Sequence, residues 1–388
     1  MSKFYTYVLF GLLTSILTAC ASTPQVQLSH NLFQDQIYAP LNEPTDSSEI
    51  FRVNAAMRQF ITSEIQPQSK TVNYQRALFN ALHNQAKLKL EYESSITRNA
   101  AETFDSRSGN CLSLVIMTAA FAKELGLTVT FQKVIMEDDW SRSGGLYFAS
   151  GHVNVVLGRK RFGDMNVSDT ENRMVIDFLP PEDIRGQRTL EISENTVVAM
   201  YMNNRAAEAL ARNDVNQAYW WARAAIETDS ALSYSYNTLG VIYMRGKHYE
   251  AAQRALSIAM DLDSNSTVAI SNMIPTLQAL GRVSEANSLS QQLADRQPYP
   301  PFHFFQLGLS AMNRSEFEEA KTLFKKEIGR APDYHEFHFW LGLAHLRLGE
   351  FEAAQKELSI AKENSATQKD FALYAAKLDR LNSMARKN

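Results

Sequence analysis

The chain has 388 residues, of which 45% are hydrophobic and 21% are charged, and its formal net charge is −3 at pH 7. This length is sufficient for two or three domains with a sizeable core. Because the charges nearly balance, nothing indicates nucleic acid or an acidic substrate as a partner. The sequence contains only two cysteines, Cys20 and Cys111.

The N-terminus has the features of an export signal. Lys3 precedes an apolar run from Tyr5 to Leu17, which is too short to span a bilayer comfortably. The run ends in Leu17-Thr18-Ala19-Cys20, which resembles a bacterial lipobox. This resemblance implies that residues 1–19 are a lipoprotein signal peptide and that Cys20 becomes a diacylated N-terminus anchored in a membrane. The alternative is an ordinary signal peptide or an N-terminal membrane anchor.

Residues 20–48 are rich in Ser, Thr, Pro, Gln and Asn, which predicts a tether. Ala21 and Ser22 follow the cysteine, and this pattern resembles outer-membrane lipoproteins facing the periplasm. If Cys20 carries lipid, Cys111 is the one thiol left in the mature chain. In an oxidising compartment it has no partner for a structural disulfide, so we expect a reactive role.

The pattern over residues 49–190 predicts an α+β domain, with helices first and an antiparallel sheet after them. Two helical patterns fill residues 49–91. Gly109 breaks the chain, and a third helix is expected from Cys111 to Leu125, where Gly126 stops it. Runs rich in β-branched residues predict three strands, at 127–136, 152–157 and 174–178. Loops are expected at 141–151 and 158–173.

Three residues of this domain form a candidate catalytic set. A cysteine at the start of a helix is favoured as thiolate, because unpaired N–H groups and the helix dipole stabilise negative charge there. His152 opens one strand on the same face as Asn154, and Asp177 lies in an apolar strand, where a carboxylate is costly without a partner. We therefore predict Cys111 as nucleophile, His152 as base and Asp177 as the group that orients the base.

The structural alternatives are a buried apolar cysteine, a hydrogen-bonded core histidine and an aspartate in a turn. A Cys/His/Asp metal site is chemically conceivable, but no CxxC or HxxxH pair supports it, so we expect neither a metal nor a cofactor.

The C-terminal half carries an internal repeat of 34 residues. It is marked by five alanines at this spacing: Ala218, Ala252, Ala286, Ala320 and Ala354. Twelve residues earlier stand Ala206, Gly240, Ile274, Gly308 and Gly342. The pattern resembles the tetratricopeptide repeat, which implies an all-α superhelix over residues 199–388, with five repeats and a final capping helix. Arg205 replaces the leucine of the Leu-Gly pair in the first repeat, and Pro275 is expected to kink or shorten a helix.

The stretches Ala101-Glu102-Thr103-Phe104 and Arg107-Ser108-Gly109-Asn110-Cys111-Leu112-Ser113 resemble a bacterial transglutaminase-like subgroup of papain-fold cysteine enzymes, in which this domain is fused to tetratricopeptide repeats. The resemblance covers about 70–185 for the enzyme domain and 199–366 for the repeats. It implies the same roles for Cys111, His152 and Asp177. It also suggests that Arg107 and Asn110 shape the site.

The repeats are expected to bind a protein or peptide partner in their groove. Asn203 and Asn237 are one period apart on the first helices of the first two repeats. Residues at positions that usually line the inner surface are Tyr234, Phe302, Phe305 and Phe339. Ordinary helix packing explains these residues equally well. His335, His338 and His345 are expected to be packing or groove residues rather than metal ligands.

Two functions follow from this sequence. The first is a lipid-anchored envelope enzyme that acts on protein or peptide amides through a Cys111 thioester, with hydrolysis favoured over transamidation. The second is a non-catalytic adaptor, in which the repeats bind partners and the papain-like domain is structural.

Overall fold

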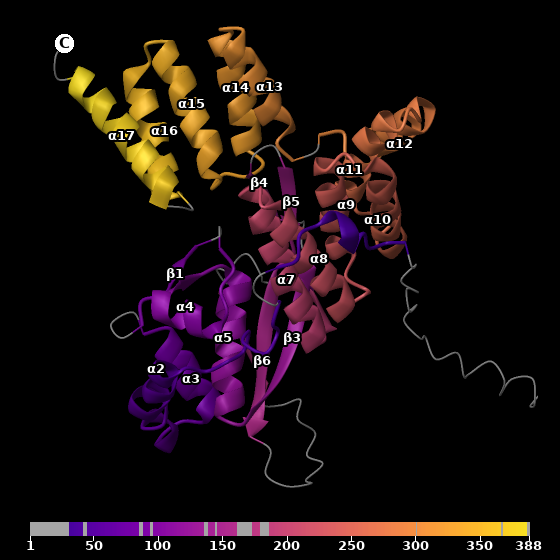
Figure 1. The fold of residues 1–388 in the computed structure, drawn as a ribbon. Coiled ribbons are helices and arrows are strands. Elements are labelled where there is room, and N and C mark those ends of the chain that lie inside the picture. Colours follow the sequence, from indigo (N-terminus) through magenta and orange to yellow (C-terminus); the bar gives the residue numbers. More distant parts are fainter. Residues whose placement is uncertain are drawn as a thin grey trace, which may run out of the picture.

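The computed structural model describes residues 31–41, 45–84, 88–93, 96–135, 139–143, 146–160, 173–178, 186–299, 301–365 and 368–385. The expected signal peptide and Cys20 lie outside these residues. An N-terminal α+β part is followed by an arc of paired helices (Figure 1). Among the described residues, no helix combines the length and apolar character needed to cross a membrane.

The α+β part begins with four α-helices: α2 (Ala55–Phe60), α3 (Tyr74–Leu82), α4 (Ala100–Ser106) and α5 (Cys111–Glu124). Each starts after an asparagine whose side chain accepts a backbone N–H of the first turn: Asn54, Asn73, Asn99 and Asn110. A π-helical turn, Ile61–Ile65, extends α2, and 3₁₀ turns form at Asp35–Ile37 and Gln68–Lys70. The predicted helix after Gly109 is confirmed, and Gly126 follows it with φ of 73°.

A four-stranded antiparallel sheet follows, in the order β7-β6-β3-β8. Its strands are β3 (Leu127–Ile135), β6 (Val153–Lys160), β7 (Met174–Ile176) and β8 (Arg188–Ile192). The three predicted strands are therefore present. Strand β8 was not predicted, because its residues are mostly polar and exposed. A short parallel pair, β1 (Glu91–Tyr92) with β2 (Ser108–Gly109), lies beside the start of α5.

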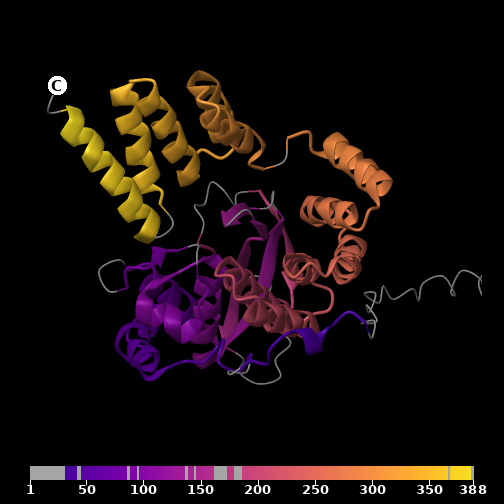
Figure 2. The same ribbon diagram turned by 45° about the horizontal axis from the view of Figure 1, so that its top comes forward.

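The expected loop at 141–151 is wrong. An antiparallel hairpin of β4 (Asp139–Ser143) and β5 (Leu146–Ser150) occupies most of it. The stretch contains Gly144, Gly145 and Gly151, and a pair of adjacent glycines between short extended runs is as typical of a hairpin turn as of a loop. The hairpin extends away from the main sheet towards α11 (Thr267–Ala279) (Figure 2).

One hydrophobic core unites the helices, the sheet and the start of the repeats. Helix α5 packs against β3 and β6, and its apolar side chains at i, i+3, i+4 and i+7 are buried: Leu112, Val115, Ile116 and Ala119. Residues 197–202 of α7 (Glu194–Ala211) belong to this same core. The expected start of the repeat domain at residue 199 thus lies inside a helix whose first half packs in the α+β part.

The repeats form an all-α superhelix of helix pairs, as predicted. After α7, their helices are α8 (Val215–Thr228), α9 (Ser233–Arg245), α10 (Tyr249–Leu262), α11, α12 (Val283–Arg296), α13 (His303–Asn313), α14 (Phe317–Ile328), α15 (His335–Arg347), α16 (Phe351–Glu363) and α17 (Gln368–Ala385). The five periodic alanines are fully buried. A Cβ atom on Gly240 or Gly308 would lie 2.6 Å from Leu256 or 2.5 Å from Phe324, so these glycines permit the close approach of paired helices.

The superhelix is divided between α12 and α13 (Figure 2). Met244 and Met260 pack against both clusters of buried residues before the division, and Trp340 packs against both clusters after it, but no residue packs against clusters on both sides. The link between them contains Pro298, Pro300 and Pro301, which cannot continue a helix. Helix α11 runs 13 residues through Pro275, as long as α9 and α15, so that proline does not shorten it.

Residues 31–41, part of the expected tether, lie against the first repeats. Leu32 and Tyr38 are buried in a cluster with residues of α8, α9 and α10. Main-chain groups of the segment bond Tyr219, Trp220 and Tyr243.

Candidate functional site

Cys111 is the first residue of α5 and is partly exposed. The preceding residue, Asn110, caps the helix by accepting the Ser113 N–H at 2.9 Å and the Ser113 hydroxyl at 2.8 Å. Gly109 allows the tight entry, because a Cβ atom there would lie 2.7 Å from Ser113 Cβ. The local sequence therefore fixes the thiol at a helix N-terminus, where negative charge is favoured.

His152 and Asp177 meet at one end of the sheet. Nε2 of His152 lies 2.7 Å from Oδ1 of Asp177, and both side chains are almost fully buried, at 6% and 5% exposure. His152 immediately precedes β6 and Asp177 immediately follows β7, and these two strands are paired. The other oxygen of Asp177 accepts from Asn154 Nδ2 at 3.2 Å. The carboxylate is thus bonded both by His152, just before β6, and by Asn154, within β6.

The charges around His152 favour its protonated ring. Burial alone would lower its pKa, but hydrogen bonds to Asp177 and Cys111, together with the charges of both groups, raise the pKa to about 9. Since Nε2 bonds Asp177, Nδ1 is the nitrogen left to face the thiol. The structure therefore brings together the three residues that the sequence singled out. This arrangement suits a thiolate–imidazolium pair.

Two further residues of the sequence motif have different positions. Asn110 is buried and caps the thiol helix, so it shapes the site directly. Arg107 has an exposed side chain and a left-handed backbone with φ of 54°. Its carbonyl accepts the Glu91 N–H, which places its contribution in the β1–β2 pair rather than beside the thiol.

Sequence reasoning missed the roles of Asn154 and Thr97. Asn154 was noted only as sharing a face with His152, yet it bonds Asp177, and its own Oδ1 has no hydrogen-bond partner within the described residues. Thr97 is 1% exposed and accepts from Asn110 Nδ2 at 2.8 Å. No sequence motif includes Thr97, and only the folded structure shows that it lies beside Asn110.

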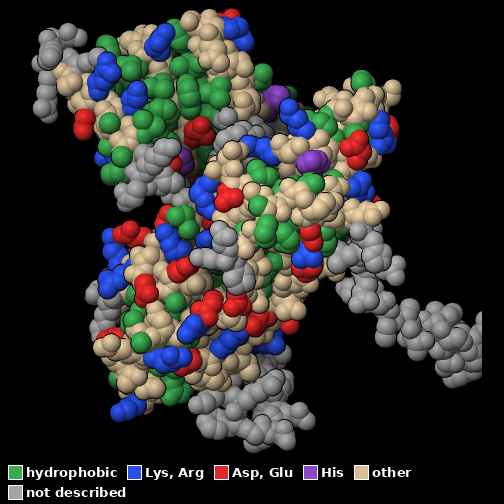
Figure 3. Space-filling model, in the orientation of Figure 1, with side chains coloured by type: hydrophobic (Ala, Val, Ile, Leu, Met, Phe, Trp, Pro, Cys, Tyr) green, Lys and Arg blue, Asp and Glu red, His purple; other side chains and the backbone are tan. Residues whose placement is uncertain are grey.

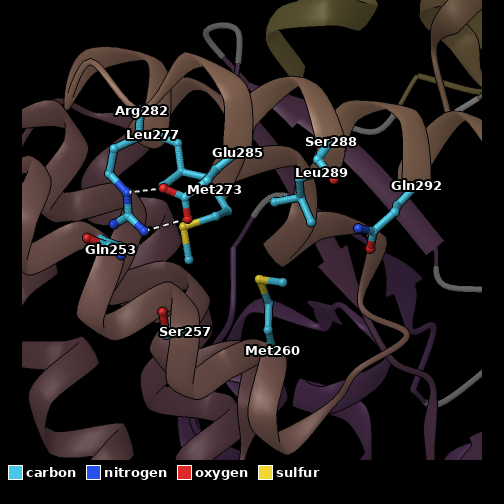
Figure 4. Close-up of a pocket in the computed structure, with 10 residues that line it drawn as sticks. All are labelled: Gln253, Ser257, Met260, Met273, Leu277, Arg282, Glu285, Ser288, Leu289 and Gln292. Atoms are coloured by element: carbon cyan, nitrogen blue, oxygen red, sulfur yellow. Dashed lines mark hydrogen bonds and ion pairs between the residues drawn. The ribbon is translucent and has the colours of Figure 1, made fainter.

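The described residues contain no cluster of His, Cys, Asp and Glu suited to a metal ion. A cavity of about 360 Å³ lies in the repeats, between α10, α11 and α12, and no residue of the thiol site lines it (Figure 4). Met260, Met273 and Leu289 contribute apolar side chains, and Arg282 forms an ion pair with Glu285 at 2.6 Å. This cavity holds no group that would extend the chemistry of the thiol site.

Most side chains expected in the repeat groove take part in packing. Phe302, Phe305 and Phe339 are buried in the cores of the helices that follow the division, α13 to α17. Tyr234 lies against Lys133 of β3, with the two polar atoms 3.3 Å apart. Asn237 accepts from Asn272, whereas Oδ1 of Asn203 has no partner within the described part of the chain.

The three repeat histidines also bond within the superhelix. His335 bonds Tyr374, His338 bonds Glu357 and Pro332, and His345 bonds Glu350. The space-filling view shows basic and acidic side chains interspersed, with hydrophobic side chains gathered over the C-terminal helices (Figure 3). The C-terminal helices contribute exposed apolar residues, among them Phe351, Phe371 and Leu373.

A family model for the tetratricopeptide repeat matches residues 305–368. This match confirms the repeat prediction for that part of the chain, which spans the last helix pairs. Such repeats are typical of proteins that bind other proteins. No curated protein shows significant similarity to the chain.

Several solved structures resemble the repeat helices. One is YrrB, described as a tetratricopeptide-repeat protein with an unusual peptide-binding site, at 20% identity over 46% of this chain and 92% of that chain, with a TM-score of 0.26. Others are PilF from Pseudomonas aeruginosa (17% identity, 49% and 87% covered, TM-score 0.31) and the Cut9–Hcn1 assembly of the APC/C (16% identity, 48% and 37% covered, TM-score 0.32). At these values the likeness is too weak to guide any assignment of function.

Proposed function

We propose that this protein is a lipid-anchored envelope enzyme with a transglutaminase-like, papain-fold domain that acts on protein or peptide amides. In this reaction the Cys111 thiolate attacks an amide carbonyl, and His152 gives its proton to the leaving amine. The resulting thioester is then cleaved by water, which makes the protein a protease or amidase rather than a transamidase. The repeats bind the protein partner.

One observation carries this proposal: a buried histidine is bonded through Nε2 to Asp177 at 2.7 Å, and its pKa is raised by that carboxylate together with Cys111, which stands at a helix N-terminus. A purely structural histidine has no need of a thiol on one side and a carboxylate on the other. The backbone N–H groups at the start of α5 offer a place for the oxyanion of a tetrahedral intermediate.

The test compares cells that carry the wild-type chain with cells that carry Cys111→Ala, both at full length. Hydrolysis predicts new protein amino termini, or deamidated side chains, in the envelope of the wild-type cells only. Transamidation instead predicts that a labelled primary amine is incorporated into an envelope protein. His152→Ala should behave as Cys111→Ala does. If neither product depends on Cys111, the enzymatic proposal fails.

The adaptor function remains the second candidate, because the repeats support protein–protein interaction by themselves. It predicts that a partner co-purifies with wild type and Cys111→Ala alike, and that both variants support the same phenotype. Deleting residues 199–388 is not a clean test, because α7 is cut inside a shared core. The full chain should be used instead.

A further inference from the structure

A loop of the α+β part lies between the thiol helix and the first repeat helix. Its residue Thr97 is held at both backbone groups by α7. The Thr97 N–H donates to Glu208 Oε1 at 2.6 Å, and the Thr97 carbonyl accepts from Arg205 Nη1 at 3.1 Å. Arg205 and Glu208 are three positions apart and therefore share one face of α7. The first repeat helix thus fixes the position of this loop.

The same loop contacts the first turn of α5. The Thr97 hydroxyl accepts from Asn110 Nδ2 at 2.8 Å, and Oδ1 of that amide caps the helix at Ser113. Because the amide is planar, a bond that holds its nitrogen also determines where its oxygen lies. The next residue, Arg98, donates its N–H to Ser113 Oγ at 2.9 Å. Two neighbouring loop residues therefore orient the groups that precede and follow Cys111.

Arg205 and Glu208 on α7 have no charged counterparts in the next repeat. One repeat later, the positions of Arg205 and Glu208 are occupied by Leu239 and Ile242, which pack in the superhelix. The Glu208 side chain is 13% exposed, and burial raises the pKa of its carboxyl, against the opposing effects of the Thr97 N–H and Arg205. Burying a carboxylate is costly unless its bonds compensate. The packing of the repeats does not require Arg205 and Glu208, whereas the contact with the Thr97 loop depends on both.

We propose that Arg205 and Glu208 are positioning residues for the thiol site: through Thr97 they hold the Asn110 side chain and with it the first turn of α5. The first repeat helix, α7, then helps to order the thiol site of the enzyme domain. The relevance to catalysis rests on the function proposed above, whereas the ordering of the helix start does not.

The first measurement is the rate at which iodoacetamide alkylates Cys111 in the full chain. Glu208→Ala removes the acceptor for the Thr97 N–H and should slow alkylation about fivefold, the effect expected for losing a helix cap. Glu208→Gln retains an acceptor oxygen and should restore the rate to within about twofold of wild type. Glu250→Ala, at an exposed position on α10, is the matched control and should leave the rate unchanged.

The second measurement is hydrogen exchange in the first turn of α5, below the unfolding temperature of every variant. Exchange at residues 111–114 should rise in Glu208→Ala and remain at the wild-type level in Glu208→Gln. Thr97→Val, which removes only the hydroxyl, should raise it as well, and Thr97→Ser should not. These substitutions keep the backbone bonds to α7, so they remain informative if Glu208→Ala does not fold.

The outcomes separate the two proposals. If exchange and alkylation in Glu208→Ala match wild type, or if Glu208→Gln is as impaired as Glu208→Ala, the positioning role is refuted. If exchange follows the expected order but no variant, wild type included, has a reactive thiol, the positioning role stands and the enzymatic function fails.

Discussion

Tyr38 stacks on Tyr219, with ring centroids 4.0 Å apart and ring planes 10° from parallel. The two residues are far apart in sequence, and their contact joins the N-terminal segment to α8. Asp35 reinforces it, because Arg223 lies 3.1 Å from its carboxylate. Residues 31–41 of the expected tether are therefore packed against the superhelix, and any membrane anchor at Cys20 would be separated from the repeats by a short stretch of chain.

This contact predicts that the segment stabilises the first repeats. Tyr38→Ala should lower the free energy of unfolding by about 2–3 kcal/mol, because a large buried aromatic side chain and its stacking are lost. Ile37→Ala, in the same segment but 39% exposed, should cost much less. Urea unfolding of both variants provides the comparison. Equal effects would mean that the stacking contributes nothing.

The candidate triad predicts a reactive Cys111. Iodoacetamide should label it near neutral pH faster than it labels a free thiol such as glutathione, and His152→Ala should slow the reaction at least about tenfold, because the imidazolium that stabilises the thiolate is gone. Asn154→Ala, which removes one hydrogen bond to Asp177, should have a smaller effect. A wild-type rate no faster than that of the free thiol would contradict the nucleophile assignment.

The surroundings of His152 predict a specific pH dependence of stability. Its pKa rises from 6.5 to about 9 on folding, so the folded state binds the proton more tightly than the unfolded state. The resulting stabilisation is fully present below pH 6.5 and is lost as the pH rises through about 9. Asp177→Asn should therefore be less stable than wild type at pH 6, and the difference should narrow by pH 10. Chemical unfolding at both pH values tests this, and a constant difference would argue against a charged ring.

Helix packing in the fourth repeat predicts a cost for a single methyl group. Gly308→Ala places a Cβ atom 2.5 Å from Phe324, which is fully buried, so the helices must separate and stability should fall by about 1–3 kcal/mol. Gly329→Ala, in the same repeat, meets only ordinary contacts at 3.5 Å and is the control. Thermal unfolding distinguishes them, and a neutral Gly308→Ala would show that the pair is less tightly packed.

The resemblance of residues 17–20 to a lipobox predicts that Cys20→Ala releases the protein from membranes without unfolding it, because the two acyl chains that we propose for Cys20 would supply nearly all of the membrane affinity. Fractionation after a salt wash, with circular dichroism of the released chain, provides the measurement. Retention of the variant in the membrane fraction would favour an uncleaved N-terminal helix instead.

The sequence alone determined the periodic features of this protein. Small residues that recur every 34 positions predict paired helices, because two helices can approach closely only where their side chains are small. Gly308 and Ala320 are examples. A glycine, a capping asparagine and Cys111 specify a thiol at a helix start, since these signals act within one turn of chain. His152 and Asp177 could be named because each stands at the end of an apolar strand, and the pairing of β6 with β7 joined them.

Only the tertiary structure decided what depends on contacts between distant segments. The sequence shows that Arg205 departs from the repeat pattern. Only the structure shows why, because Arg205 bonds the carbonyl of Thr97, which lies in a loop without a recognisable motif. Tyr38 belonged to a stretch whose composition indicated a tether, and it became ordered because Tyr219 offers it a buried surface. Composition and periodicity report what a segment can do by itself, whereas burial against another segment is a property of the folded chain.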